Sequence, residues 1–362
     1  MRRYQDTGRI WLAASLLCFA LACGKAPLPE VQPEEPVEVS FTVGTDDDAA
    51  TRASSGENGT VGKGKSIDKL IYAVYDSQGN LLEKFGAAEA DRENGIGVGQ
   101  SVVKKGDDGS FSLNLTLVRG QEYKVVFWAQ NSASKVFDTM EGLDRVRILY
   151  DGAVNNDDEN RDAFCKAEIF TATESGTRKV TLRRPFAQIN LGMEAEEYEK
   201  LLNSWGWTDE ASTPLTVELS VGPVAKEFNV VDNSVNGSED NTREAVFAAA
   251  VPLEESLFVH VSKKPQTDAP AADEETEYKW LSMCYILVAD ATEGASTYSS
   301  ELSSLSYTLR CGDEFKKLVF LPGKKEGFTV PVQRNWSTNL LVSMQDVLDI
   351  CGEGEEVNNE SI

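Results

Sequence analysis

The chain has 362 residues and a formal net charge of -24 at pH 7, and a surface this acidic repels nucleic acid and anionic lipid headgroups. Its one histidine, His260, makes a histidine-rich metal site or a histidine-dependent catalytic triad unattractive. Because the sequence also has no G-x-S-x-G or dinucleotide fingerprint, we expect neither catalysis nor a cofactor, a metal or a nucleic-acid partner.

Residues 1–22 have the pattern of an export signal. Three arginines and one aspartate precede or flank an apolar run, Ile10–Ala22, which is too short to span a bilayer. The run ends in A-L-A-C, and small residues before a cysteine are what a lipoprotein signal peptidase requires. We therefore predict removal of residues 1–22 and acylation of Cys23, which anchors the mature chain in outer-membrane lipid. Plain secretion with cleavage nearby is the alternative.

Residues 23–36 are rich in proline and glutamate, a composition that favours an extended tether. The next segment alternates apolar and polar residues, which predicts a strand whose buried face consists of Val37, Val39, Phe41 and Val43.

A run of acidic and small residues follows this strand and contains one basic residue, Arg52, a candidate site for an arginine-specific protease. Cleavage there would separate the strand covalently from the rest of the chain. An equivalent strand from another copy could then fill its groove by strand addition. The simpler interpretation is an ordinary edge strand followed by a loop.

The first half of the chain continues with strand signals separated by turns. Ser66–Asp76 reads as a central strand buried on both faces, with Leu81–Phe85 as its hairpin partner. Further strands are predicted at Phe111–Leu117, Tyr123–Gln130, Ala163–Phe170 and Arg178–Leu191, the last of which ends the first domain and contains Pro185, implying an edge position or a break. Asn155–Asn160 is rich in oxygen ligands but lacks EF-hand spacing, so no calcium site is expected.

The second half begins with the one convincing helix signal, Glu194–Trp205. Its place predicts a junction between domains over 194–214, although a crossover within one domain would give the same pattern. About nine short strands follow. The predicted fold is therefore all-β, with two tandem β-sandwiches over residues 37–193 and 215–350 and an acidic tail over 351–362.

Four cysteines remain after export, Cys165, Cys284, Cys311 and Cys351, and an exported protein permits disulfides. Cys284–Cys311 is the least speculative pair, but four free and buried thiols fit nearly as well. Trp128 and Trp280 lie in strands of core type, so the core interpretation is favoured over a sugar-binding platform.

Several of these pieces, in their order along the chain, resemble the fimbrillin-like lipoproteins of Bacteroidetes, and in particular a domain of unknown function common among them. They are the lipid signal at Cys23, V-E-V-S-F-T-V followed by A-T-R-A, I-D-K-L-I-Y-A-V-Y-D-S-Q-G, Y-K-V-V-F-W-A-Q, R-P-F-A-Q-I-N-L-G and V-P-V-Q-R-N-W-S-T-N-L-L.

The resemblance implies transthyretin-like sandwiches and a role as a fimbrial subunit or adhesin of type V pili, with other subunits or itself as partners. It also implies that a protease removes the first strand, here residues 37–43 with processing at Arg52, and that a neighbour's strand replaces it. The chain departs from the pattern at its C-terminus, where only Asn339–Ile350 has the alternation that a donor strand needs. A surface lipoprotein that binds glycan or host protein without polymerising is therefore the alternative.

Overall fold

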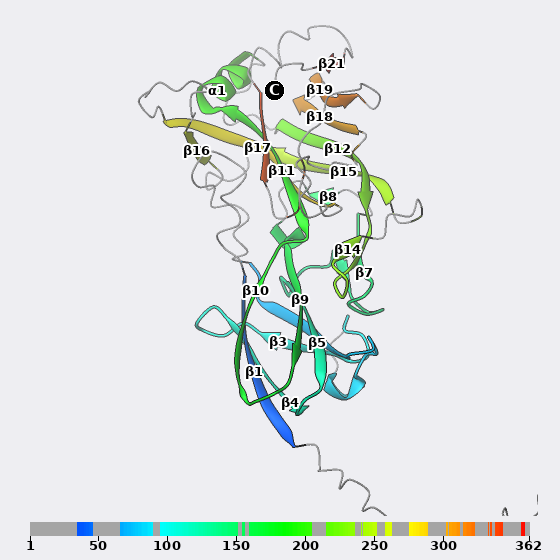
Figure 1. The fold of residues 1–362 in the computed structure, drawn as a ribbon. Coiled ribbons are helices and arrows are strands. Elements are labelled where there is room, and N and C mark those ends of the chain that lie inside the picture. The colour runs from blue at the N-terminus through cyan, green and yellow to red at the C-terminus, as the bar shows by residue number, and fades with distance from the viewer. Residues whose placement is uncertain are drawn as a thin grey trace, which may run out of the picture. The chain divides into compact units, whose positions relative to one another are not determined.

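The computed structural model describes residues 35–45, 66–89, 95–150, 154–155, 159–204, 215–235, 240, 242–251, 258–262, 275–288, 302, 304–311, 314–322, 332, 334, 337–342 and 356–358. Residues 1–36 and 37–362 are separate units, and the fold is that of the second. Strands dominate the described residues, which include a single α-helix (Figure 1), so the predicted all-β class is confirmed.

The N-terminal lobe consists of two sheets packed face to face. The first has the order β10 (Gly176–Leu182), β1 (Pro36–Thr45) and β4 (Phe111–Val118). The second has the order β3 (Gln100–Lys104), β2 (Lys69–Asp76), β5 (Glu122–Gln130) and β9 (Ala163–Thr171). Alternation explains the packing, because every second residue of β4 is buried and the residues between them are exposed.

The partner of β2 differs from the sequence prediction. β2 and β3 are antiparallel neighbours, with Leu70 opposite Val103. The predicted hairpin strand over 81–85 is wrong: Leu81 makes one isolated bridge to Tyr75, and Glu83–Phe85 is a 3-10 turn. The physical reason is that β3 occupies this side of β2 and β5 occupies the other, so the chain leaves the sheet after a single bridge.

The C-terminal lobe also has two facing sheets. One has the order β16 (Phe258–Ser262), β17 (Glu275–Leu287), β11 (Phe186–Glu194) and β20 (Ser337–Val342). The other has the order β21 (Glu356–Asn358), β19 (Glu314–Pro322), β18 (Ser304–Cys311), β12 (Leu215–Ala225), β15 (Thr242–Val251) and β8 (Val154–Asn155). The two packed pairs of sheets agree with the predicted pair of sandwiches.

Residues 178–191 form two strands and not one, because the break that Pro185 implied is present and the chain changes lobes there. β10 ends at Leu182 beside β1, whereas β11 starts at Phe186 and pairs antiparallel with β17 and parallel with β20. Proline fixes its own backbone angle and cannot donate a ladder hydrogen bond, which suits it to the break between the two strands.

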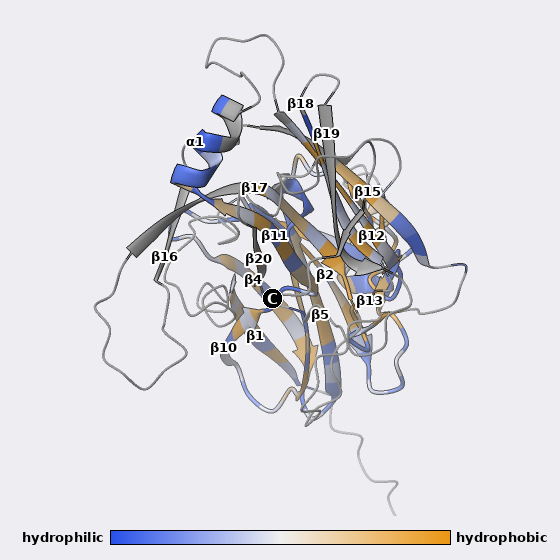
Figure 2. Ribbon diagram, turned by 90° about the horizontal axis from the view of Figure 1, so that it is seen from above, coloured by the Kyte–Doolittle hydropathy of each residue, from blue (hydrophilic) through white to orange (hydrophobic). Residues whose placement is uncertain are grey.

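The helix α1 (Ala195–Ser204) lies within the predicted helical range. It leads from β11 to β12, and both strands belong to the C-terminal lobe, so the helix is a crossover within that lobe. The coloured part of the helix is mainly hydrophilic, whereas hydrophobic residues lie along the strands of the sheets (Figure 2). Its Tyr198 is buried against the core.

Trp128 of β5 joins the core of the N-terminal lobe to that of the C-terminal lobe. The sheet β3-β2-β5-β9 is buried on both faces, and Trp128 lies on the face turned away from β1, with its side chain fully buried. Its ring centroid is 5.3 Å from that of Phe137, 6.5 Å from Phe186 and 6.3 Å from Phe228. Phe228 comes from a small sheet in the order β14 (Ser234–Val235), β13 (Glu227–Asn229), β7 (Val146–Ile148) and β6 (Phe137–Asp138). Trp128 is thus a core residue, as predicted.

Cys165 and Cys284 are free and buried, so the suggested Cys284–Cys311 disulfide is wrong. Burial also raises the pKa of the Cys165 thiol to about 12 and raises that of Cys284, because a thiolate loses its hydration in these surroundings. Both behave as small apolar side chains.

Candidate functional site

β1 occupies the middle of its sheet. It runs parallel to β10, with Val39 opposite Gly176 at one end of the ladder and Thr45 opposite Leu182 at the other. β4 lies along its other side. The first described strand is therefore bonded along both edges and is not an edge strand.

The four predicted apolar side chains of β1 form part of the core. Val37, Val39, Phe41 and Val43 are exposed by only 1%, 3%, 1% and 0%. They pack against residues of β4 in the same sheet and of β2, β5 and β9 in the facing sheet. Burial of four such side chains contributes on the order of 10 kcal/mol relative to leaving them in water. The sheet is therefore incomplete without β1.

The outward face of β1 is polar and is bonded to both neighbours. Ser40 Oγ donates to Asn114 Oδ1 at 2.7 Å, and Thr116 Oγ1 donates to Glu38 Oε1 at 2.7 Å. These partners run in opposite directions along the two strands, as in an antiparallel pair. The amide of Glu38 donates to Ser175 Oγ at 3.0 Å, just before β10 begins.

The other predicted site residues lie outside the described part of the chain. Cys23, the predicted acylation site, falls in residues 1–34, and Arg52, the predicted processing site, falls in residues 46–65. The described strand ends at Thr45, seven positions before Arg52. Sequence reasoning missed β10 as the parallel partner of β1, because alternation marks strands and faces but does not show which strands become neighbours.

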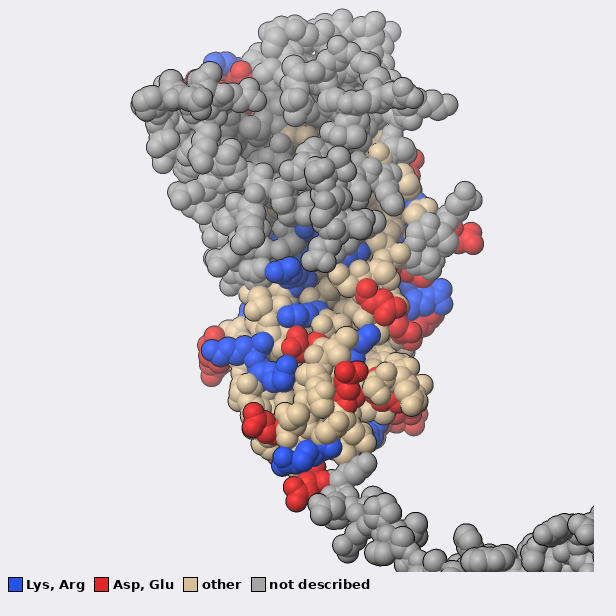
Figure 3. Space-filling view, viewed as in Figure 1, with Lys and Arg blue, Asp and Glu red and all other residues tan. Residues whose placement is uncertain are grey.

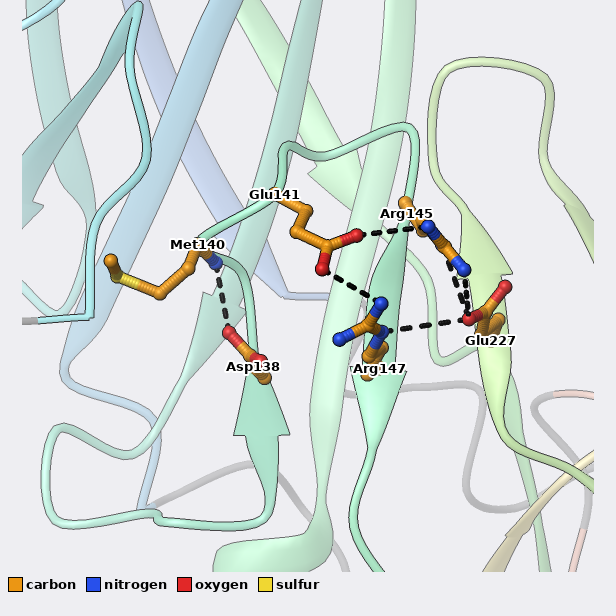
Figure 4. A network of polar contacts seen from close by, with 6 residues as sticks. All are labelled: Asp138, Met140, Glu141, Arg145, Arg147 and Glu227. Atoms are coloured by element: carbon orange, nitrogen blue, oxygen red, sulfur yellow. Dashed lines mark hydrogen bonds and ion pairs between the residues drawn. The ribbon is translucent and has the colours of Figure 1, made fainter. Parts of the chain in front are cut away.

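A charged cluster lies where β7 meets β13 (Figure 4). Glu227, with a side chain 9% exposed, accepts hydrogen bonds from Arg145 Nε at 3.1 Å and Nη2 at 2.9 Å, and lies 3.5 Å from Arg147 Nε. Glu141 bridges the same two arginines at 3.0 Å and 2.7 Å. The hydrogen bond and charge of Glu227 raise the pKa of Arg145.

The charged cluster borders a surface hollow of about 430 Å³ that is also lined by Asp144, Phe228, Asn229 and Ser234. Both guanidinium groups already face carboxylates, so the arrangement cross-links β7 and β13. On the described surface that faces the viewer, basic and acidic side chains are interspersed among uncharged residues (Figure 3).

Among the described residues, no group of three His, Cys, Asp or Glu side chains is arranged to hold a metal ion. The part of the chain that the structure describes also contains no helix long and apolar enough to cross a membrane. His260 lies in β16, opposite Glu277 of β17.

No curated protein matches this chain. Solved structures with a similar arrangement include a proposed adhesin from Bacteroides thetaiotaomicron VPI-5482, at 12% identity and a TM-score of 0.40, covering 79% of each chain. The fimbrial anchor protein Mfa2 from Porphyromonas gingivalis has 9% identity and a TM-score of 0.36, covering 76% of this chain and 78% of its own. A proposed cell adhesion protein from Bacteroides eggerthii DSM 20697 has 12% identity and a TM-score of 0.39, covering 91% and 94%.

A family profile spans both lobes. It matches residues 31–344, a range that begins just before β1 and ends just after β20. The chain therefore belongs to the family of unknown function DUF6562, which confirms the expectation of a domain of unknown function.

Proposed function

We propose that this chain is a non-enzymatic cell-surface protein whose precursor is anchored in outer-membrane lipid through acylated Cys23. After cleavage at Arg52 it acts as a fimbrial subunit or fimbrillin-like adhesin and assembles by donor-strand exchange. The observation that carries the proposal is the position of β1. Four of its side chains are buried in the core, it lies between β10 and β4, and it is joined to the rest of the fold through the segment that contains Arg52.

Loss of β1 would have two physical consequences. The facing edges of β10 and β4 would lose their ladder partner, and unpaired backbone groups are costly when they are shielded from water. The core side chains beneath β1 would also be exposed and would line an apolar groove. A strand supplied by another subunit would pair the freed backbone groups and cover the exposed core side chains. Strand addition provides backbone hydrogen bonds and pocket-filling side chains together.

The C-terminal strands favour an accepting role over a donating one. β20, which overlaps the first residues of the segment considered as a donor, pairs parallel with β11 at the edge of its own sheet. β21, in the acidic tail, pairs with β19. A chain whose last strands are already paired would suit a terminal position, such as an anchor or a tip. The same observation supports the alternative of a surface lipoprotein that binds glycan or host protein without polymerising.

Proteolysis followed by electrophoresis tests the proposal. The purified protein is cut with an arginine-specific protease in the presence of a candidate donor subunit and run in SDS without boiling. We expect SDS-resistant complexes from the cut protein and none from an Arg52→Gln variant, which leaves the strand attached. A cut protein that releases β1 and yet stays monomeric contradicts assembly by strand exchange.

The N-terminus of the surface-exposed form provides a second, independent test. A start at Ala53 is the expected result for a processed subunit. A start at Cys23 throughout the surface population contradicts processing and favours the non-polymerising alternative.

A further inference from the structure

Phe41 is the largest inward side chain of β1, and it enters an aromatic pocket. Its ring centroid lies 5.7 Å from that of Phe127 on β5, with 58° between the ring planes. It lies 5.6 Å from that of Phe170 on β9, with 67° between the planes. Tilted and edge-on contacts at these separations are the favourable arrangements for aromatic rings. The other three inward residues of β1 are valines and make none of these ring contacts.

An arginine closes the outer side of this pocket. The guanidinium of Arg178 lies 4.3 Å from the centre of the Phe170 ring, and Arg178 is the residue of β10 directly opposite Phe41. It also forms an ion pair with Glu168 at 3.3 Å. The walls of the Phe41 pocket, formed by Phe127, Phe170 and Arg178, therefore come from β5, β9 and β10, none of which is β1.

Because of the position of Phe41, the pattern of inward residues differs when the strand is read in the opposite direction. These residues read V-x-V-x-F-x-V, so the phenylalanine is the third of the four inward residues. In a strand inserted in the opposite direction, the ring would fall at the position of Val39 and miss the pocket. A slip of two residues would also miss it, and a slip of one would turn every apolar side chain outward. A pattern of four valines would not separate these alternatives as sharply.

We propose that the groove occupied by β1 selects its strand through one aromatic side chain seated in the Phe41 pocket, which fixes both the register and the direction of the incoming strand. This inference rests on the proposed strand exchange and specifies the chemistry of the partner. The partner strand has small β-branched residues at the other inward positions and one aromatic residue third among the four.

The segment of this chain that was considered as a donor does not fit the Phe41 pocket. Residues 339–362 of this chain, which include the segment with the alternation expected of a donor, contain no Phe, Tyr or Trp. A second copy of the chain could supply the ring through its own residues 36–45 but not through residues 339–350. The groove therefore accepts a donor segment that carries an aromatic residue at the position of Phe41, which residues 339–350 do not.

Peptide exchange tests the selection. The full-length protein is cut after Arg52, so that β1 remains seated but is no longer joined to the fold, and is mixed with a fluorescent peptide of residues 35–45. Uptake is followed by native electrophoresis. Unlabelled competitors are the same peptide, its Phe41→Ala, Phe41→Leu and Val37→Ala variants, and the peptide with its sequence reversed.

We expect Phe41→Ala to weaken competition by about 100-fold or more and Val37→Ala by roughly tenfold, since removal of a buried phenyl ring costs far more than removal of two methyl groups. Phe41→Leu should fall between them, and the reversed peptide should compete as poorly as Phe41→Ala. Equal competition by all the peptides contradicts the proposal that an aromatic side chain selects the strand, but leaves strand exchange intact. Failure of the unchanged peptide to enter overturns the strand exchange itself.

Discussion

Arg184 and Asp162 form a bidentate ion pair where the two lobes meet. Arg184 Nε donates to Asp162 Oδ1 at 2.6 Å, and Nη2 donates to Oδ2 at 2.7 Å, with both side chains buried. The guanidinium also lies 4.7 Å from the ring centre of Phe164 and 5.5 Å from that of Tyr285. Since Phe164 belongs to the core beneath β1 and Tyr285 to the core of the C-terminal lobe, this pair connects the two.

Asp162→Asn should lower the free energy of unfolding by about 3–5 kcal/mol, because it leaves the Arg184 charge buried without a counter-charge. Urea denaturation followed by circular dichroism measures the loss. The double variant Asp162→Leu with Arg184→Met should recover most of it, since no buried charge remains. A double variant that is less stable than Asp162→Asn contradicts this explanation.

An added charge should destabilise the protein strongly at one position of β1 and hardly at all at the next. Val43 is fully buried opposite Val180, so Val43→Asp should destabilise the protein by at least about 3 kcal/mol. Thr42 is partly exposed opposite Lys179, so Thr42→Asp should change stability by less than about 0.5 kcal/mol. The urea midpoints of the two variants give the comparison. Similar losses in both would show that β1 does not bury one face in solution.

The two carboxylates of the charged cluster, those of Glu227 and Glu141, should contribute unequally to the stability of the fold. The Glu227 side chain is 9% exposed and binds both arginines, whereas that of Glu141 is 43% exposed. Glu227→Gln should therefore lower the denaturation midpoint clearly more than Glu141→Gln, because exposed ion pairs contribute little. High salt should reduce the effect of Glu141→Gln further. Equal effects of the two variants contradict a structural role for Glu227.

Cys165 should resist thiol reagents in the folded protein. Its pKa is raised to about 12, so the reactive thiolate stays scarce from pH 7 to pH 9, whereas an ordinary thiol with a pKa of about 8.5 ionises in that range. Mass spectrometry after iodoacetamide treatment should find Cys165 and Cys284 unmodified in native protein and modified in urea. Labelling of Cys165 that accelerates with pH in native protein contradicts this prediction.

Much of the strand content could be predicted, because alternation along a strand is a local property. The pattern over 37–43 predicted which four side chains of β1 are buried, and that over 111–117 did the same for β4. The predicted helix and the two sandwiches were also correct in kind. Buried strands such as β5 were recognisable from runs of apolar residues.

The errors all concern contacts between distant segments. Leu81 lies next to β2 in sequence, yet the position beside β2 belongs to β3. Cys284 and Cys311 lie on adjacent segments of the chain but in different sheets, and Cys284 is free. Residues 186–194 follow β10 closely in sequence, just after Pro185, but pair with β17 and β20.

The sequence by itself determined that residues 37–43 form a strand with one apolar face and that an isolated arginine follows at position 52. Only the tertiary structure decided that this strand lies between β10 and β4 and that Phe41 meets Phe127 and Phe170. The physical reason is that the period of a strand specifies which side chains are buried, whereas its neighbours are chosen by packing among segments far apart in the chain.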